Sequence, residues 1–135
     1  MTLLDIVIVY LAFRAKQLIC DYFLQTSWMA LEKGNHWRPL AAHAGIHAAF
    51  TFFLMLLFAP TLWWLGAVDF LVHGAIDRFK AGLTLKKGWT PAMNEFWWAL
   101  GVDQEAHNIT HLGYVVAIVA AHGVSFSAAL TILQP

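Results

Sequence analysis

The segment from Asp69 to Asp77, DFLVHGAID, sets an acid, a histidine and a second acid four residues apart. This spacing places Asp69, His73 and Asp77 on one face of an α-helix, one turn apart. The residues between them are apolar or small. The segment therefore predicts a helix with a single polar stripe on an apolar surface.

The same spacing recurs in three other apolar stretches of the chain. Gln17 and Asp21 are four residues apart, as are His43 and His47, and the run from Asp103 to His111 repeats the pattern with His107 in the middle. A helix that crosses a bilayer needs about 20 mostly apolar residues. The four stretches predict four spans and an all-α, integral membrane four-helix bundle. The spans cover about residues 3–24, 39–59, 62–80 and 98–122.

Composition supports this class of protein. The 135 residues are 60% hydrophobic and 12% charged, with a formal net charge of zero. That balance excludes a disordered chain and the basic surface of a nucleic-acid binder. The length predicts a single domain over residues 1–135. The lone cysteine, Cys20, forms no internal disulfide, and in a regular helix it is turned about 100° away from Asp21.

The ends of the spans carry their own signals. Arg14 and Lys16 interrupt the first apolar stretch, which predicts a retained span and not a cleaved signal peptide. Pro60 predicts a break between the second and third spans, and Thr90 before Pro91 predicts the start of the segment that contains the last. The run from Ser27 to Lys33 predicts a short helix at the membrane surface. A soluble helical bundle is the alternative.

Loop charges predict the orientation. The first loop carries Lys33 and Arg38, and the third carries Lys86 and Lys87 with Arg78 and Lys80 at its edge, whereas the second loop and both tails carry no lysine or arginine. By the positive-inside rule, the first and third loops face the cytoplasm and both termini face outward. Five tryptophans cluster near the same two loops, as in an interfacial belt. They are Trp28, Trp37, Trp89, Trp97 and Trp98.

With this topology the polar residues fall into three layers, because each residue of a helix rises about 1.5 Å. The layer nearest the cytoplasm holds Asp21, His43, Asp77 and Asp103. One turn deeper lie Gln17, His47, His73 and His107. The deepest layer holds Arg14, which precedes Asp21 by seven residues, with Thr51, Asp69 and His111.

Imidazole and carboxylate groups that converge from facing helices are typical ligands of zinc, iron and manganese. The upper layers therefore predict one or two divalent metal ions, with zinc as the first choice. In the layer below, Asp69 is expected to accept from a ligand histidine or to pair with Arg14, and His111 to support it. The alternative is that these groups satisfy one another without metal. The expected ligands are Asp21, His43, His47, His73, Asp77, Asp103 and His107, with Gln17 and Gln104 beside them.

Other polar residues have simpler interpretations. His36 is expected to be solvated in a loop, and His122 to lie at the far membrane surface. Lys16 is expected to face a partner subunit or to extend to the interface. Lys80 shares the face of His73 and could bind a substrate anion, with extension to the interface as the alternative.

The motifs also resemble a known family. In order along the chain, these motifs are DYFLQT from Asp21, WMA from Trp28, Lys33, His43 and His47, His73 with Asp77 and Lys80, DQ from Asp103, and His107. With them the chain resembles the bacterial and phage membrane-protein family called domain of unknown function 3307. The likeness covers about residues 21–111 and implies a small multi-pass protein of the bacterial inner membrane. The chain resembles membrane-bound metal-dependent hydrolases more loosely. Its HxxxD pair, His73 and Asp77, also resembles that of zinc phospholipase C and nuclease bundles.

Two functions follow as hypotheses. The first is a metal-dependent hydrolase at the cytoplasmic leaflet, acting on a lipid-like substrate with a phosphate or ester, with Asp103 or Asp69 as proton acceptor. The second is an accessory or regulatory subunit of a membrane complex, with a structural metal or a His-Asp core. Expected partners are the bilayer, the substrate, and a second copy or a complex partner, without nucleic acid. Transport of ions is disfavoured because the polar stripe fades beyond His111.

Overall fold

The computed structural model describes residues 1–123. Within them every regular element is a helix, which confirms the all-α prediction. Four helices are long and one is short, with a π-helical turn and a 3-10 turn between them. The elements are α1 (Leu3–Leu18), η1 (Ile19–Phe23), α2 (Ser27–Glu32), α3 (Trp37–Phe58), η2 (Pro60–Leu62), α4 (Leu65–Lys87) and α5 (Asn94–Ala121).

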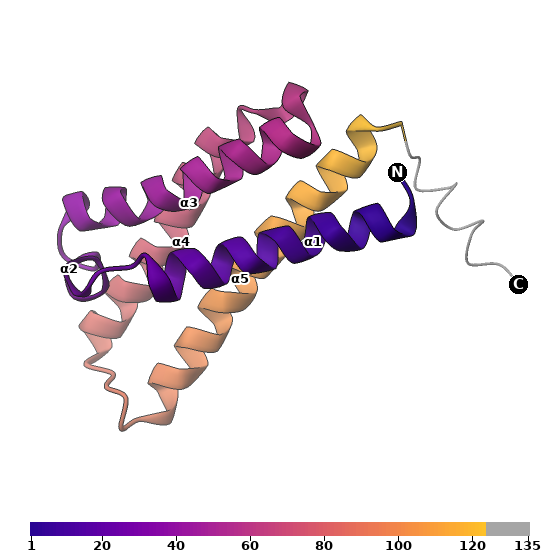
Figure 1. Cartoon of the computed structure of the whole chain (residues 1–135). Helices are drawn as coiled ribbons and strands as arrows, with labels where there is room; N and C mark the ends of the chain where they lie inside the picture. Colours follow the sequence, from indigo (N-terminus) through magenta and orange to yellow (C-terminus); the bar gives the residue numbers. More distant parts are fainter. Residues whose placement is uncertain (124–135) are drawn as a thin grey trace, which may run out of the picture.

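The four long helices form a ring (Figure 1). α3 packs against α4, α4 against α5, α5 against α1, and α1 against α3. The short helix α2 lies at one end of the bundle, and the N-terminus and the end of α5 lie at the other. The ring thus encloses one interior, with the α4–α5 connection at the same end as α2.

Local signals explain where most helices begin and end. The Thr2 hydroxyl accepts a hydrogen bond from the Asp5 amide, and the Asp5 carboxylate accepts one from the Thr2 amide, so the two residues form a capping box for α1. The Thr26 hydroxyl caps α2, and η2 begins at Pro60. Gly88 ends α4 with a φ of 64°, a left-handed conformation that glycine adopts without strain.

The last helix begins after Pro91, as expected, but the predicted N-terminal cap at Thr90 was wrong. Thr90 and Pro91 lie in a turn closed by a hydrogen bond from the Met93 amide to the Thr90 carbonyl, and α5 begins at Asn94. Gly101 lies inside α5 without breaking it. The third helix continues to Lys87, beyond the predicted end at residue 80.

A glycine allows the closest approach of α3 and α4. A Cβ atom added at Gly66 would lie 2.8 Å from the Phe52 Cβ and 3.1 Å from the Ala48 carbonyl oxygen. Real Cβ atoms do not come so close to their neighbours. Gly66 therefore fixes the distance between the two helices, as small residues do where helix backbones pack tightly.

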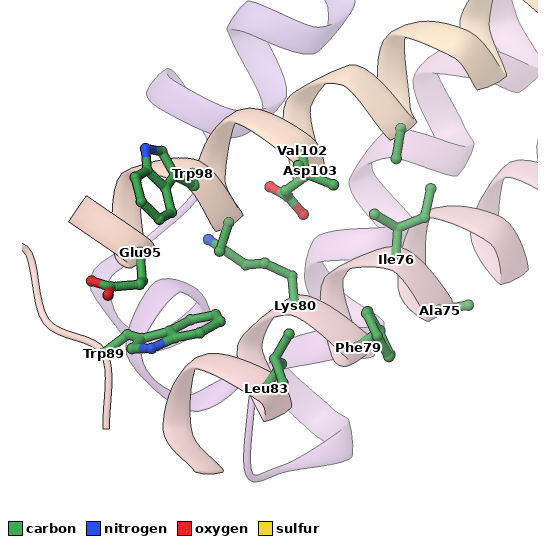
Figure 2. Close-up of a pocket in the computed structure, with 12 residues that line it drawn as sticks. Ala75, Ile76, Phe79, Lys80, Leu83, Trp89, Glu95, Trp98, Val102 and Asp103 are labelled. Atoms are coloured by element: carbon green, nitrogen blue, oxygen red, sulfur yellow. The ribbon is translucent and has the colours of Figure 1, made fainter. Parts of the chain in front are cut away.

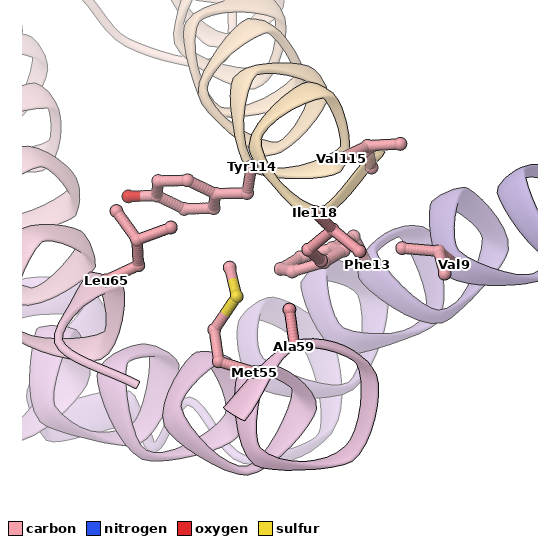
Figure 3. Packing of buried hydrophobic residues seen from close by; sticks show 8 residues of the cluster. All are labelled: Val9, Phe13, Met55, Ala59, Leu65, Tyr114, Val115 and Ile118. Atoms are coloured by element: carbon pink, nitrogen blue, oxygen red, sulfur yellow. The ribbon is translucent and has the colours of Figure 1, made fainter. Parts of the chain in front are cut away.

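The interior has an apolar half and a polar half. The apolar half contains the first part of α1, the end of α3, the start of α4 and the last turns of α5, at the end of the bundle remote from α2. Figure 3 shows how its side chains pack together. Toward α2 the buried side chains are mainly acids, lysines and histidines, whereas many large apolar side chains are exposed on the outside. The apolar cluster consists of Val9, Phe13, Met55, Ala59, Leu65, Tyr114, Val115 and Ile118.

Length and composition single out one helix of residues 1–123, α3, as able to cross a bilayer. The helices α1, α4 and α5 carry more charge or are shorter.

Candidate metal centre

The site begins where α1 turns into a π-helix. The Leu24 amide donates to the Ile19 carbonyl five residues earlier. A π-helical turn rotates less per residue than an α-helix, and such turns are frequent at functional sites. Here the turn directs Asp21 toward the interior, where its Oδ1 lies 3.0 Å from His47 Nε2 and 3.4 Å from His43 Nε2.

Two amides hold the same carboxylate from the other side. Gln17, one turn earlier on α1, donates its Nε2 hydrogen to Asp21 Oδ2 at 2.7 Å. Gln104 of α5 donates to the same oxygen at 3.2 Å. The structure thus places both predicted supporting glutamines beside Asp21, leaving Oδ1 directed at the histidines.

Four buried imidazoles extend from α3, α4 and α5 into one cluster. The rings of His47 and His73 stack with centroids 3.6 Å apart, and those of His73 and His107 stack at 4.0 Å. His43 Nε2 lies 3.3 Å from His73 Nε2. Because the imidazoles stack closely, protonating more than one of them would place like charges side by side.

Asp77 is the second carboxylate of the cluster. Its Oδ2 lies 3.1 Å from His43 Nε2 and 3.6 Å from His73 Nε2, and its Oδ1 lies 3.8 Å from His107 Nε2. The candidate ligand atoms form two groups in which all atoms are within 4.8 Å of one another. Both groups contain His73. The first is Asp21, His43, His47 and His73, and the second is His73, Asp77 and His107.

The distances between these atoms are informative. Ligands about 2.0–2.1 Å from a tetrahedral zinc ion are roughly 3.3–3.4 Å from one another. Several separations in the cluster, from 3.1 to 3.8 Å, are near this value, and most exceed the usual hydrogen-bond length of about 2.9 Å. These separations could accommodate a shared cation, whereas His47 Nε2, 3.0 Å from Asp21 Oδ1, is at hydrogen-bond distance.

Asp103 lies at the edge of the cluster. Its Oδ1 is 3.7 Å from His107 Nε2, and the residue is not part of either group. Its side chain is buried, with 6% of the residue exposed, yet Oδ1 has no hydrogen-bond partner among residues 1–123. The structure thus brings together six of the seven expected ligands, and the seventh, Asp103, is an adjacent free carboxylate.

The deepest layer holds a buried ion pair. Lys16 Nζ lies 2.7 Å from Asp69 Oδ2 and 3.0 Å from His111 Nε2, and the Thr51 hydroxyl donates to Asp69 Oδ2 at 2.7 Å. Lys16 is 2% exposed and Asp69 1% exposed. The predicted partner of Asp69, Arg14, lies instead on the exposed side of α1.

The helix geometry explains this correction. The buried face of α1 contains Val9, Phe13, Lys16 and Gln17, and Asp21 reaches that interior only through the π-helical turn. Counting back seven residues from Asp21 at α-helical spacing therefore led to the wrong face. Lys16, expected to face a partner or the interface, is inside.

Sequence reasoning also missed Lys33. The short helix α2 ends beside the cluster, and Lys33 Nζ donates to Asp77 Oδ2 and to Gln25 Oε1, both at 2.9 Å. Arg78 donates to the Gly34 carbonyl and fastens the same loop to α4. The resemblance included Lys33, but its charge alone suggested only a cytoplasmic loop residue.

The remaining candidates lie outside the cluster. His36 is exposed beside Glu32, and His122 Nδ1 lies 2.8 Å from the Ile118 carbonyl at the end of α5. Lys80 is half-buried, with Nζ 5.9 Å from the centre of the Phe96 ring. Cys20 is buried as a free thiol.

Fold and site together define an all-helical protein with a buried His-Asp cluster suited to a cation. The chain belongs to the family described as Protein of unknown function (DUF3307), whose model matches residues 8–134. No curated protein and no solved structure matches the chain.

Proposed function

We propose that the protein is an integral membrane metalloprotein of the bacterial inner membrane, and that it acts as a metal-dependent hydrolase at the cytoplasmic leaflet. One observation carries the proposal. Four imidazole Nε2 atoms and two carboxylates from four segments of the chain converge within the polar half of a bundle whose exterior is largely apolar.

The exposed surface supports a membrane environment. Large apolar side chains such as Leu11, Phe53, Leu71 and Val116 are exposed along all four long helices. In water this would be a large apolar patch, whereas in lipid it is the expected surface. The 22 residues of α3 span about 33 Å, close to the roughly 30 Å of a bilayer core.

Tryptophans mark both ends of the bundle. Trp28 and Trp37 are exposed at the α2 end, and Trp63 and Trp64 are exposed beside η2 at the other end. Tryptophan is enriched at the two surfaces of a membrane. The lysines and arginines of the connections near α2 support a cytoplasmic position for that end and for the proposed metal centre near it.

Charged groups interrupt the apolar exterior within the proposed spans, two of them far from the Lys- and Arg-rich connections. Arg14 of α1 is exposed, and so is Glu105 of α5, which accepts a hydrogen bond from Asn108. Charges within a membrane span are costly unless they are paired. A second copy of the chain or another membrane protein would cover these groups, so they are the natural place for a partner.

The chemistry follows from the position of each residue. A divalent ion such as zinc, iron or manganese would act as a Lewis acid and make bound water acidic. The six cluster residues would hold one or two such ions, and His73 would belong to either position. Asp103, with a free oxygen beside His107, is the better placed proton acceptor, since Asp69 already accepts from Lys16 and Thr51.

The first experiment is elemental analysis of the full chain purified in detergent without chelators. We expect one or two equivalents of a divalent transition metal. The variant His73→Ala should lose most of it, whereas the matched variant His36→Ala, which removes an exposed histidine, should retain it. Helical content and elution volume check that both variants fold. Wild-type protein without stoichiometric metal contradicts the metal centre.

Hydrolysis is tested separately with the metal-loaded protein. Release of phosphate or carboxylic acid from lipid phosphate esters and acyl esters is measured for wild type and Asp103→Asn. General acid–base catalysis contributes about 10²- to 10⁴-fold to rates, so the variant should lose activity in that range while keeping its metal. Equal rates for the two proteins would remove Asp103 from this role.

A second function is favoured by the two buried lysines. Lys33 and Lys16 already supply positive charge to Asp77 and Asp69, as a purely structural His-Asp core would require. The protein would then be an accessory subunit of a membrane complex. A His73→Ala variant that folds, assembles and supports cell growth like wild type favours this function over catalysis.

A further inference from the structure

A cavity of about 850 Å³ lies between α4 and α5. Its walls come from Ala75 to Leu83 on α4, from Trp89, and from Glu95 to Ala106 on α5, and they are apolar over nearly all their surface (Figure 2). The volume is within the range of about 300–1,000 Å³ that is usual for small-molecule sites. The cavity is outside the His-Asp cluster but shares one wall with it.

Asp103 forms that shared wall. It lines the cavity, is more than nine-tenths buried, and leaves Oδ1 without a partner among the described residues. A buried polar atom without a partner costs free energy, so a ligand that donates a hydrogen bond to Oδ1 would be favoured once the Asp103 side chain turns toward the cavity. The same carboxylate is next to His107, which connects the cavity with the proposed metal centre.

Lys80 supplies the opposite charge. Its side chain lines the cavity, and it forms no ion pair within residues 1–123. In Figure 2 the Lys80 and Asp103 side chains both extend into the space between the two helices. An amine and a carboxylate in one apolar cavity match a ligand that carries an anion and a hydrogen-bond donor on an apolar body.

The apolar part of the cavity lies deeper in the proposed membrane than the polar part. Ala75 and Ala106 are farther from the cytoplasmic connection of α4 and α5 than Lys80, whereas Trp89 and Glu95 lie at that connection. A lipid of the cytoplasmic leaflet has the same arrangement, with its chains deeper than its head group.

We propose that this cavity binds a membrane lipid with a phosphate head group. The phosphate contacts Lys80, the P–OH group of its monoanion donates to Asp103, and an acyl chain lies between α4 and α5 against Ala75, Ile76 and Ala106. This proposal rests on the proposed membrane metal centre. It makes such a lipid the substrate of the proposed hydrolase, with Asp103 between the bound head group and the metal centre.

Photo-crosslinking tests the proposal. The full chain is placed in phosphatidylcholine bicelles with phosphatidic acid that carries a diazirine in its acyl chain, and labelled residues are identified by mass spectrometry. A diazirine diacylglycerol without phosphate is the second probe. We expect more labelling at Ile76, Val102 and Ala106 than at Phe53 and Leu57, which are exposed apolar residues of α3. Phosphatidic acid should label the cavity about tenfold more than diacylglycerol does, which is the effect of one strong charge-assisted contact.

Variants separate the cavity from its surroundings. Ala106→Trp fills the cavity and should remove the preferred labels, whereas Ala120→Trp, at an exposed alanine of α5 outside the cavity, should not. Lys80→Met should abolish the preference for phosphate while labelling by diacylglycerol persists. Equal labelling of the cavity and of α3, or crosslinks from the cavity to a second copy of the chain, overturns the proposal.

Metal content is measured on the same samples. If the protein contains metal but the lipid probes label the cavity and α3 equally, only the lipid site is contradicted. Specific labelling without metal contradicts the proposed metal centre but leaves the lipid site in place. The two proposals can therefore fail separately.

Discussion

Replacing Lys16 by methionine should strongly destabilise the protein. The change keeps most of the side-chain volume but removes the Nζ atom, which lies 2.7 Å from Asp69 Oδ2. Asp69 would then be a buried carboxylate without a cationic partner, although the Thr51 hydroxyl would still donate a hydrogen bond to it. Removing one partner of a buried ion pair costs about 3–5 kcal/mol, and with both groups almost inaccessible to solvent we expect a value in that range.

The assay measures reversible unfolding of the full chain in detergent micelles, with the loss of helix monitored by circular dichroism. Arg14→Met is the matched control, because Arg14 is on the same helix but exposed, and its stability should equal that of wild type. The double variant Lys16→Met with Asp69→Asn removes both charges and should recover part of the loss. A strong effect of Arg14→Met, or none of Lys16→Met, refutes the assignment of Lys16 as the buried partner.

Three further predictions concern the helix packing, the ligands and the pH. Gly66→Ala should lower the free energy of unfolding by about 1–3 kcal/mol, because the new Cβ would clash with the Cβ of Phe52. The control Gly45→Ala, with open space around Gly45, should not destabilise the protein. Equal unfolding curves for the two variants would mean that α3 and α4 are farther apart. Lys33→Met should tighten metal binding in competition titrations with a chelator, because the ammonium group occupies Asp77 Oδ2, and weaker binding would instead make Lys33 a support for the ligand. Metal content should fall as the pH is lowered, because protons compete with the metal for the imidazole nitrogens, and a constant content down to acidic pH would argue against histidine ligands.

The repeated spacing of four residues predicted much of the site. It placed His43 and His47, and His73 and Asp77, on single faces of α-helices, and the structure has regular α-helix at these positions. Depth along each helix follows from a fixed rise per residue, so residues of different helices could be compared before any contact was known. The layers were therefore predictable wherever the helices are regular.

The errors come from irregular backbone and from tertiary contacts. The π-helical turn at Ile19–Phe23 changes the angle about the helix axis between Asp21 and the earlier part of α1, so α-helical spacing wrongly predicts Arg14 in place of Lys16. Lys33 follows a short helix whose position depends on how its loop folds back onto α4. Pro91 is as compatible with the turn that precedes α5 as with the first turn of a helix.

The central claim is that a divalent metal ion lies among the Nε2 atoms of the four histidines and the carboxylates of Asp21 and Asp77. The most direct test is an anomalous diffraction map of the full chain, recorded at the absorption edge of the metal that elemental analysis identifies. We predict a peak within about 2.0–2.2 Å either of the Nε2 atoms of His47 and His73, or of His73 and a carboxylate oxygen of Asp77. A map without a peak in the cluster, or with its metal bound elsewhere, contradicts the account.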